Sequence, residues 1–424
     1  MHTLKEIYQD NEEHNFIDPS LYSRYRVKAG LRNDNGTGVK VGLTKICDVI
    51  GYKIIHEKKY NIDGQLIYRG YPINYLVNKQ PSDKICGFEE TAYLLIFGTL
   101  PNADQLKTFK DYLLNFKMGP VDLQYETPNI LNALQIEVLK LYAKDPSADT
   151  DDLEERMMKG LKILASIPLF TFSYARNKVF KSYPYPDRSL AENILCMARG
   201  NDQYTFEEAK IMDTLLMIHA DHGGGNNSTF ANVVISSTGT DIYSCISAAI
   251  GSLKGPKHGG ANCKVTNMFK AIFHEVGFTT DKATLKKIAN RILDKDFFDH
   301  SGLIYGIGHA IYTKSDPRAL LIHEQCEALA KSKGQEEIYN CIHAFEKVAI
   351  EVMKERKGID VCANVDYYSG YVYSLLGIEA DLFTPLFAIS RTAGWVSHHL
   401  ENRQSNRKLI RPANVYVGEM EEIK

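Results

Sequence analysis

Four short segments of this 424-residue chain combine histidine, aspartate or arginine with glycine at places where helices should begin or end. They read HADHGGGNN (219–227), GPKHGGANC (255–263), GIGHAIYTKSDPR (306–318) and NVDYYSG (364–370). Glycine lacks a side chain, so the backbone beside it can approach a ligand closely. His222, His258 and His309 all have such neighbours. A single histidine of this kind would be an ordinary core or surface residue, so it is the recurrence that predicts a ligand pocket.

Three kinds of site are compatible with the first segment. His219 and His222 would share a face of a continuous helix and could bind a metal with His258, as in a hydrolase. A helical zinc pair, however, has a spacing of four with glutamate between, and no third ligand stands at a recognisable distance. GGGNN also lacks the GxxxxGK[ST] frame of a phosphate loop. We therefore predict no metal, and the wall of an anion pocket is the third possibility.

Composition excludes several classes of protein. The chain is 44% hydrophobic and 24% charged, with a formal net charge of -2, so a large core is expected and nucleic acid or an anionic membrane surface is not. No apolar run approaches the roughly 20 residues of a membrane span. The N-terminal residues MHTLKEIYQDNEEHNF are acidic and fit neither a secretory signal nor a transit peptide, so the cytoplasm is expected.

Hydrophobic periodicity predicts a mainly α fold. Helical patterns cover much of 87–116 (with a stop at GTLP), 149–176, 189–200, 205–225, 315–334, 335–358 and 381–401. Several of these segments end at glycine, as helices commonly do. DVIGYKII (48–55) and GQLIYRG (64–70) predict one small β-hairpin near the N-terminus. No linker of biased composition separates the segments, so any domains should be packed together.

The ordered motifs resemble those of the citrate synthase family. They are HADHGGGNNSTF, GPKHGGAN, GIGHAIYTKSDPRA, NVDYYSG, SRTAGW with Arg391, and RPANVYVG, which begins with Arg411 and its proline. YRGYPI, FEETAYLLIFGTLP and SLAENILCMA are also similar to the family pattern. The resemblance runs from roughly residue 40 to 418, and six motifs in the same order are highly specific.

The resemblance implies roles for particular residues. His258, His309 and Asp366 would be catalytic. Oxaloacetate or the product would be bound by His222, Asn226, Arg318, Arg391 and Arg411. It also implies a homodimer with a large domain (1–259 and 381–424), a small helical domain (260–380) and the site between them. Arg411 would reach the partner's site. Acetyl-CoA would be a substrate, and no cofactor is expected.

The chemistry of condensation explains these residue types. A proton must leave the thioester methyl, so Asp366 can act as the base only if the enolate is stabilised as it forms. A neutral His258 would donate to the thioester oxygen, and His309 would polarise the carbonyl of oxaloacetate. Because oxaloacetate is a dianion, planar bidentate arginines suit it. On this interpretation HADHGGGNN is the wall of a dicarboxylate pocket.

Three features depart from the usual pattern. Lys257 stands where the family commonly has an apolar residue, and it should face solvent or a CoA phosphate. Thr313 replaces a frequent basic CoA contact, with Lys314 one residue later. Lys257 and Lys314 are therefore the candidate CoA contacts. The first 38 residues lack the period-2 pattern of an added β domain, which argues against control by NADH.

Alternatives remain at this stage. A 2-methylcitrate synthase would use propionyl-CoA with the same residues, and one methylene is worth only about 1–3 kcal/mol in an apolar pocket. A metal-dependent hydrolase is the rival from another class, and metal analysis would distinguish it. A non-catalytic scaffold would not need all of these residues. Citrate lyase-type relatives use ATP or further domains.

Overall fold

The computed structural model describes residues 16–119, 123, 127–405 and 408–418, together with residues 5, 6 and 9. Its contacts group the chain into two compact units: the body, residues 44–409, and a second unit formed by residues 1–43 and 410–424. In the second unit lie α2 (Ser20–Arg24) and a short turn of 3-10 helix, η2 (Ala29–Leu31).

The body is helical with one small sheet, which confirms the predicted fold class. Its strands are β1 (Cys47–Ile55), β2 (Lys58–Tyr68) and β3 (Tyr71–Pro72). Its helices are α3 (Ile73–Asn78), α4 (Gly87–Phe97), α5 (Ala103–Leu114), α6 (Ile130–Ala143), α7 (Leu153–Ala175), α8 (Leu190–Arg199), α9 (Phe206–His219), α10 (Asn227–Ser236), α11 (Ile242–Lys254), α12 (Ala261–Val276), α13 (Lys282–Leu293), α14 (Pro317–Ser332), α15 (Glu336–Lys357), α16 (Val365–Leu375), η3 (Ala380–Leu382) and α17 (Phe383–Ser405). No helix in the described ranges is both long and apolar enough to cross a bilayer.

Local sequence sets many helix ends. The helices α5, α8 and α9 each begin with a capping box, in which an Asn, Ser or Thr and a Gln or Glu three residues later bond each other's backbone N–H. α8 ends at Gly200, whose φ of 72° is the left-handed conformation that glycine adopts without strain. These ends were predictable because they depend on neighbouring residues only.

The end of α9 differs from the prediction, which carried the helix on to the glycines at 223–225. The helix stops at His219 because tertiary hydrogen bonds capture the next backbone groups. Gly394 donates its N–H to the carbonyl of Ala220 (3.1 Å), and the backbone of Asp221 both donates to the Tyr68 hydroxyl (3.1 Å) and accepts from it (2.8 Å). His219 and His222 therefore do not share a helix face.

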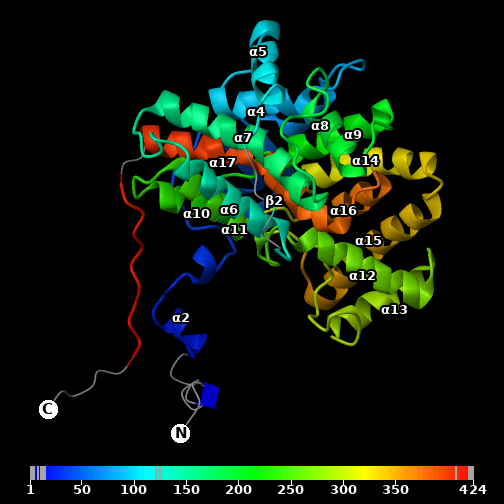
Figure 1. Cartoon of the computed structure of the whole chain (residues 1–424). Coiled ribbons are helices and arrows are strands. Elements are labelled where there is room, and N and C mark those ends of the chain that lie inside the picture. The colour runs from blue at the N-terminus through cyan, green and yellow to red at the C-terminus, as the bar shows by residue number, and fades with distance from the viewer. Residues whose placement is uncertain are drawn as a thin grey trace, which may run out of the picture. The chain divides into compact units, whose positions relative to one another are not determined.

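The helix α17 runs through the centre of the body, in contact with α4, α7, α9, α10, α11 and α12 (Figure 1). It is buried continuously from Phe383 to His399. Such a helix would be expected to be apolar on every side, yet it carries Arg391 within this buried stretch. Burying a cation costs free energy, so Arg391 indicates a functional requirement.

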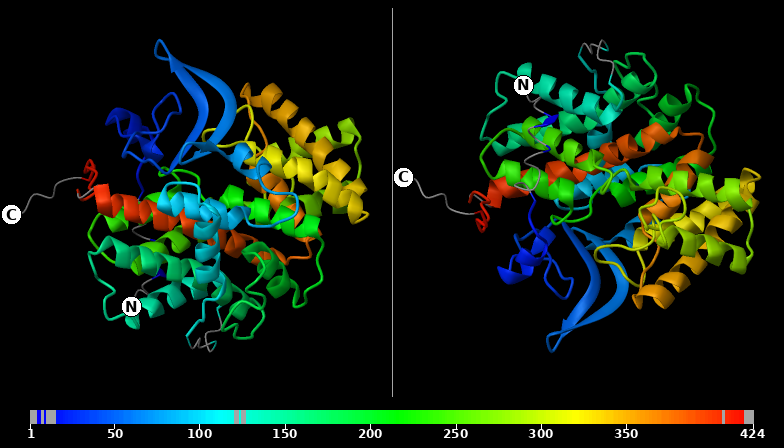
Figure 2. Two further views of the ribbon diagram at one scale, coloured as in Figure 1. Left: turned by 90° about the horizontal axis from the view of Figure 1, so that it is seen from above. Right: turned by 90° about the horizontal axis from the view of Figure 1, so that it is seen from below.

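The predicted hairpin is present and longer than expected, projecting from the helices (Figure 2). β1 and β2 pair antiparallel up to Ile55 and Lys58, with positive φ angles at His56 and Glu57 in the turn. The sequence pattern did not predict residues 58–63 as part of β2, because this end of the strand is polar and largely exposed.

Two glycines bring the hairpin against the segment that contains His309. A Cβ on Gly51 would lie 2.3 Å from the carbonyl oxygen of Ile311, and one on Gly64 would lie 2.1 Å from that of Ser315. Gly64 also donates its N–H to the Ser315 hydroxyl (3.1 Å). The hairpin thus supports the loop that precedes α14.

The helices α12 to α16 contact one another and lie together in Figure 1. They fall within the predicted small domain, 260–380. The body also includes the helices of the predicted large domain, and the boundaries at 259/260 and 380/381 stay predictions.

Candidate active site

His258 lies in the tight turn between α11 and α12. Its backbone N–H donates to the carbonyl of Gly255 (2.9 Å). The next residue must be glycine, because a Cβ on Gly259 would lie 2.6 Å from the carbonyl oxygen of Leu253. Gly259 therefore serves the turn that presents His258, whereas the predicted close approach of the backbone to a ligand stays a prediction.

The loop that carries His309 is tied to the start of α16. Gly308 donates its N–H to the carbonyl of Cys362 (2.8 Å), and the Asn364 side chain donates to the carbonyl of Gly308 (2.8 Å). Gly306 has a φ of 81° and packs so closely on Tyr367 that a Cβ would lie 2.8 Å from the ring. Because Asn364 also caps α16, these contacts hold His309 beside the helix of Asp366.

The hydrogen bonds of His309 assign its tautomer. The Nδ1 atom accepts the backbone N–H groups of Ile311 and Tyr312, both at 3.1 Å. An accepting nitrogen carries no proton in a neutral imidazole, so the proton is on Nε2. The ring stacks on Tyr312 with centroids 4.7 Å apart. The ring nitrogen that can act as a hydrogen-bond donor is therefore Nε2.

Asp366 is the second residue of α16 and is half-buried. Its Oδ1 atom is buried without a hydrogen-bond partner in the described part of the chain. Burial raises the pKa of its carboxyl to about 6, against the opposing positive charges of Arg318 and Arg391. A carboxyl with a pKa near neutrality and a buried, unpaired oxygen is suited to accept a proton from a substrate.

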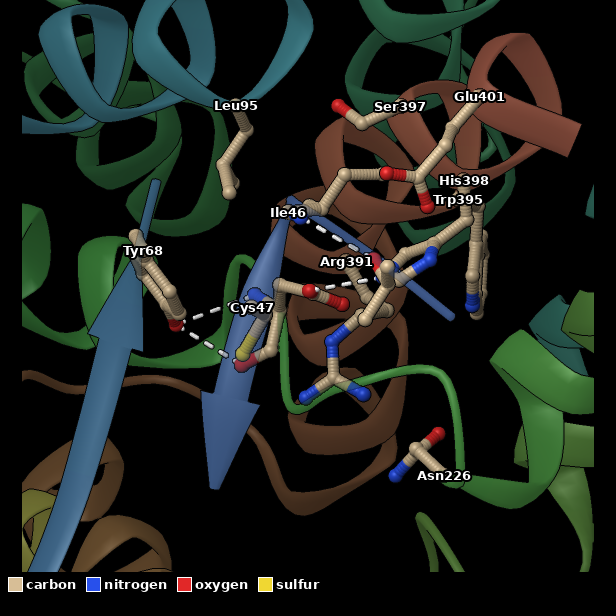
Figure 3. A network of polar contacts seen from close by, with 12 residues as sticks. Ile46, Cys47, Tyr68, Leu95, Asn226, Arg391, Trp395, Ser397, His398 and Glu401 are labelled. Carbon is tan, nitrogen blue, oxygen red and sulfur yellow. Dashed lines mark hydrogen bonds and ion pairs between the residues drawn. The ribbon is translucent and has the colours of Figure 1, made fainter. Parts of the chain in front are cut away.

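Arg391 is fully buried, at 0% exposure. Its Nε donates to the carbonyl of His219 (2.7 Å), while both terminal nitrogens are buried without hydrogen-bond partners among the described residues. Figure 3 shows its guanidinium extending from α17 toward the region of Asn226. A guanidinium with two free parallel donors matches one carboxylate.

Arg318 is also buried, but its charge is already paired. Its Nε and one terminal nitrogen donate to the two carboxylate oxygens of Asp316, at 3.0 and 2.7 Å. Burial alone would lower the pKa of Arg318, but Asp316 more than offsets this and raises it. Asp316 thus orients Arg318 and leaves only some of its N–H donors for a ligand. The sequence motif does not show this difference between Arg318 and Arg391.

His222 is buried edge-on against the stacked rings of His309 and Tyr312, with centroids 5.2 and 5.7 Å away. Its Nε2 has no hydrogen-bond partner within the described ranges. Burial, followed by the positive charges of Arg318 and other neighbours, lowers its pKa well below the ordinary value. His222 is therefore neutral near pH 7 in the free protein, and not one of a set of cations as its grouping with the arginines suggested.

Ser228 contacts His258 and Asn226, and the sequence analysis did not identify it as a site residue. Its hydroxyl donates to Oδ1 of Asn226 (2.9 Å), accepts from the indole N–H of Trp395 (3.2 Å) and lies 3.0 Å from Nε2 of His258. Burial and the charge of Arg391 lower the pKa of His258 to about 4, so the ring is neutral. Its position two residues after Asn226 in HADHGGGNNST was the available signal.

Further supporting residues become visible only in three dimensions. Phe387 lies one turn before Arg391, with its ring 4.6 Å from the guanidinium carbon and 6.1 Å from the His258 ring. Nearby, buried Asp221 has its Oδ2 atom 3.0 Å from Nε2 of His398.

The remaining predicted residues, Lys257, Lys314 and Arg411, are exposed. Arg411 belongs to the second unit. No group of three or more His, Cys, Asp or Glu side chains in the described parts of the chain could hold a metal. His219 in particular is buried, with its Nδ1 2.7 Å from the carbonyl of Leu215.

Comparisons with known proteins show the family of this chain. The family described as "Citrate synthase, C-terminal domain" matches residues 33–413. A citrate synthase of Haloferax volcanii is 37% identical, covering 87% of this chain and 94% of the relative. A 2-methylcitrate synthase of Corynebacterium glutamicum is 33% identical, covering 83% and 89%. Citrate synthase of Thermoplasma acidophilum, solved with carboxymethyl coenzyme A and oxaloacetate, superposes with a TM-score of 0.75 at 26% identity, covering 91% and 96%.

Proposed function

Since the chain belongs to the citrate synthase family, it is an acyltransferase, and we propose that it condenses acetyl-CoA with oxaloacetate and water to give citrate and CoA. The observation that carries the substrate assignment is the pair of buried, unpartnered terminal nitrogens of Arg391. Leaving such donors unsatisfied is costly unless a ligand pairs with them, and a carboxylate of oxaloacetate does so bidentately.

The proposed reaction uses Asp366, His258 and His309 in order. Asp366 removes a proton from the thioester methyl while His258 donates a hydrogen bond to the thioester oxygen. The resulting carbon nucleophile forms a C–C bond to the carbonyl of oxaloacetate, and Nε2–H of His309 protonates the new alkoxide. Water then attacks the thioester carbonyl and gives a proton back to His309. The C–S bond breaks, the proton held by Asp366 passes to the leaving thiolate, and citrate and CoA leave.

Ser228 can set the tautomer of His258. If Nε2 of His258 accepts the single Ser228 proton, the imidazole proton must be on Nδ1, which is then free to donate to the thioester. Ser228 donates instead to Asn226 in this structure, so we propose that substrate binding at Asn226 redirects this proton. His222 and Arg318 complete the proposed oxaloacetate pocket as a neutral donor and a pre-oriented cation.

Other parts of the proposal rest on the resemblance. We propose a homodimer with no metal or cofactor, and Lys257 and Lys314 as contacts for CoA phosphates. The small domain, 260–380, would close on the large domain to exclude water from the thioester. The cytoplasm stays the location predicted from composition.

The choice of acyl group is tested by kcat/KM for acetyl-CoA and propionyl-CoA, each with oxaloacetate. A clear preference for acetyl-CoA is expected. The second candidate, 2-methylcitrate synthesis, is favoured by the 33% identical relative and would be established by the opposite ratio. Failure to condense either thioester would contradict the proposed function itself.

The pH dependence of kcat/KM should show a limb near pH 6. Asp366 must be ionised to accept a proton, and its pKa is about 6 in the free protein, so activity falls as pH drops below that value. His258 does not supply this limb because its pKa is about 4 and it stays neutral. The measurement uses both substrates well below saturation. A profile flat from about pH 5 to 8 would contradict the role of Asp366.

The trans role of Arg411 is tested by mixing inactive subunits. A heterodimer of Asp366→Asn and Arg411→Ala subunits should have one intact site, so activity should return after subunit exchange. The matched control mixes Asp366→Asn with Arg391→Lys, which impairs a residue of the same body and should restore nothing. If exchange is demonstrated and the first mixture stays inactive, Arg411 does not act in trans.

A further inference from the structure

A pocket of about 480 Å³ lies between α12, α15 and α16, outside the candidate active site. Its lining includes Phe269, Phe273, Ile338, Ile342, Tyr367 and Leu375. Small-molecule sites commonly measure about 300–1,000 Å³, so this pocket has the size of a ligand site. None of the proposed catalytic or oxaloacetate-binding residues contributes to its lining.

The walls of the pocket require an apolar ligand. Phe269, Phe273, Ile338, Ile342 and Leu375 supply aromatic and aliphatic surface.

The polar groups among these walls are bonded to the protein itself. The hydroxyls of Thr266, Tyr367 and Tyr371 donate to backbone carbonyls at 3.0, 2.8 and 3.0 Å respectively. These hydroxyls therefore need no hydrogen bond from the ligand. Burial of the apolar surface of the ligand against these walls would be favourable.

The rim of the pocket is positively charged. Lys270 and Lys333 both line it, and Lys333 and Leu375 are shared with a neighbouring cavity of about 410 Å³. Arg176 and Arg199 line that neighbouring cavity. Among the residues that the structure describes, the ion pairs of these four cations involve two carboxylates: Glu208 pairs with Arg199 and Lys333, and Glu379 pairs with Arg176. An anionic group at the rim would meet excess positive charge.

We propose that this pocket binds an amphiphile with an apolar chain and an anionic end, of the class of medium-chain carboxylates or their CoA thioesters. The chain would lie against Phe269, Phe273 and Ile338, and the anionic end beside Lys270 and Lys333. The two sources share this chemistry and differ in the group attached to the acyl carbon.

Occupancy should affect catalysis, a consequence that rests on the proposed function. α12 begins three residues after His258, and α16 carries Asp366 in its first turn. Tyr367, which lines the pocket, is adjacent to Asp366 and packs on Gly306 in the His309 loop. A chain that presses on this wall displaces the base and lowers kcat, while the KM for oxaloacetate changes less than twofold.

Calorimetric titration of the full-length protein tests binding directly. Decanoate and decanoyl-CoA are titrated separately in the presence of excess CoA, with decanol and butyrate as ligands that lack the charge or the chain. Saturable binding of decanoate or decanoyl-CoA is expected, at least tenfold tighter than that of decanol or butyrate. Whichever of decanoate and decanoyl-CoA binds more tightly identifies the source of the anionic end as the free carboxylate or the CoA thioester.

Two variants locate the ligand. Lys270→Glu should weaken binding about fivefold, the size expected of a rim charge, and Ile338→Glu should weaken it at least tenfold. Lys287→Glu, an exposed charge reversal on α13, is the matched control and should bind as the wild type does. Absence of saturable binding, or equal affinity in the wild type, Lys270→Glu and Ile338→Glu, would overturn the proposal.

The same titrations separate the two proposals. If the protein binds decanoate in this way but makes no citrate, the pocket proposal stands and the proposed function fails. If the protein makes citrate but binds neither ligand, only the pocket proposal fails.

Discussion

Asp366→Asn should lower kcat by about 10²–10⁴-fold, the contribution typical of a positioned general base. The amide has nearly the same shape as the carboxyl but cannot accept the proton of the thioester methyl. The buried Oδ1 atom of Asp366 has no hydrogen-bond partner in the described structure, so the substitution breaks no hydrogen bond at that atom. The variant should therefore fold, and steady-state kinetics with both substrates measures the loss.

Binding of oxaloacetate separates a catalytic role of Asp366 from a structural one. Asp366→Asn should still bind oxaloacetate, because the donors of Arg391, Arg318 and His222 remain. Its thermal denaturation should shift upward with oxaloacetate as in the wild type. Near-normal kcat would refute the assignment of the base. Loss of the thermal shift together with activity would mean that Asp366 shapes the pocket.

Arg391→Lys should raise the Kd for oxaloacetate by about 10- to 100-fold. Lysine keeps the positive charge but cannot present two parallel donors, and one hydrogen bond to a charged group is worth about 1.5–3 kcal/mol. A ligand at 100 times its Kd stabilises a protein by about 2.7 kcal/mol, so a fixed oxaloacetate concentration gives a ready measurement. A 10- to 100-fold rise in Kd should remove about half to most of this stabilisation in the variant.

Arg403→Lys is the matched control. It makes the same substitution on the same helix, α17, but Arg403 donates to Asp151 at 2.6 Å near the surface. This variant should bind oxaloacetate as the wild type does. If Arg391→Lys retained wild-type affinity as well, the two free donors of Arg391 would not be the carboxylate site, and the argument for the substrate would fail with them.

Much of the fold follows from local sequence. Asn102, Ser189 and Thr205 begin helices because each bonds the backbone of its own first turn. The predicted helix and hairpin segments agree with the structure for the same reason, since periodicity and capping involve neighbours in the chain. The hairpin arm at 58–63 was hidden because its strand is polar and exposed.

The end of α9 illustrates what local sequence misses. Nothing in HADHGGG stops the helix at His219. The stop depends on Gly394 and Tyr68, which are distant along the chain and bond the backbone of residues 220 and 221. A helix boundary set by tertiary hydrogen bonds is not encoded in its own residues.

The candidate site divides in the same way. The sequence by itself determined the mainly α fold through hydrophobic periodicity, and the family resemblance through the order of the motifs. The resemblance in turn implied His222, His258, His309, Asp366, Arg318 and Arg391, whose types suit the chemistry. Only the tertiary structure decided their states. Burial makes His222 neutral and raises the pKa of Asp366, Asp316 pairs with Arg318, and the terminal nitrogens of Arg391 are left without partners. The charge state of a side chain, its tautomer and whether its donors have partners all depend on the residues around it. Those residues come from distant segments and meet only when the chain folds.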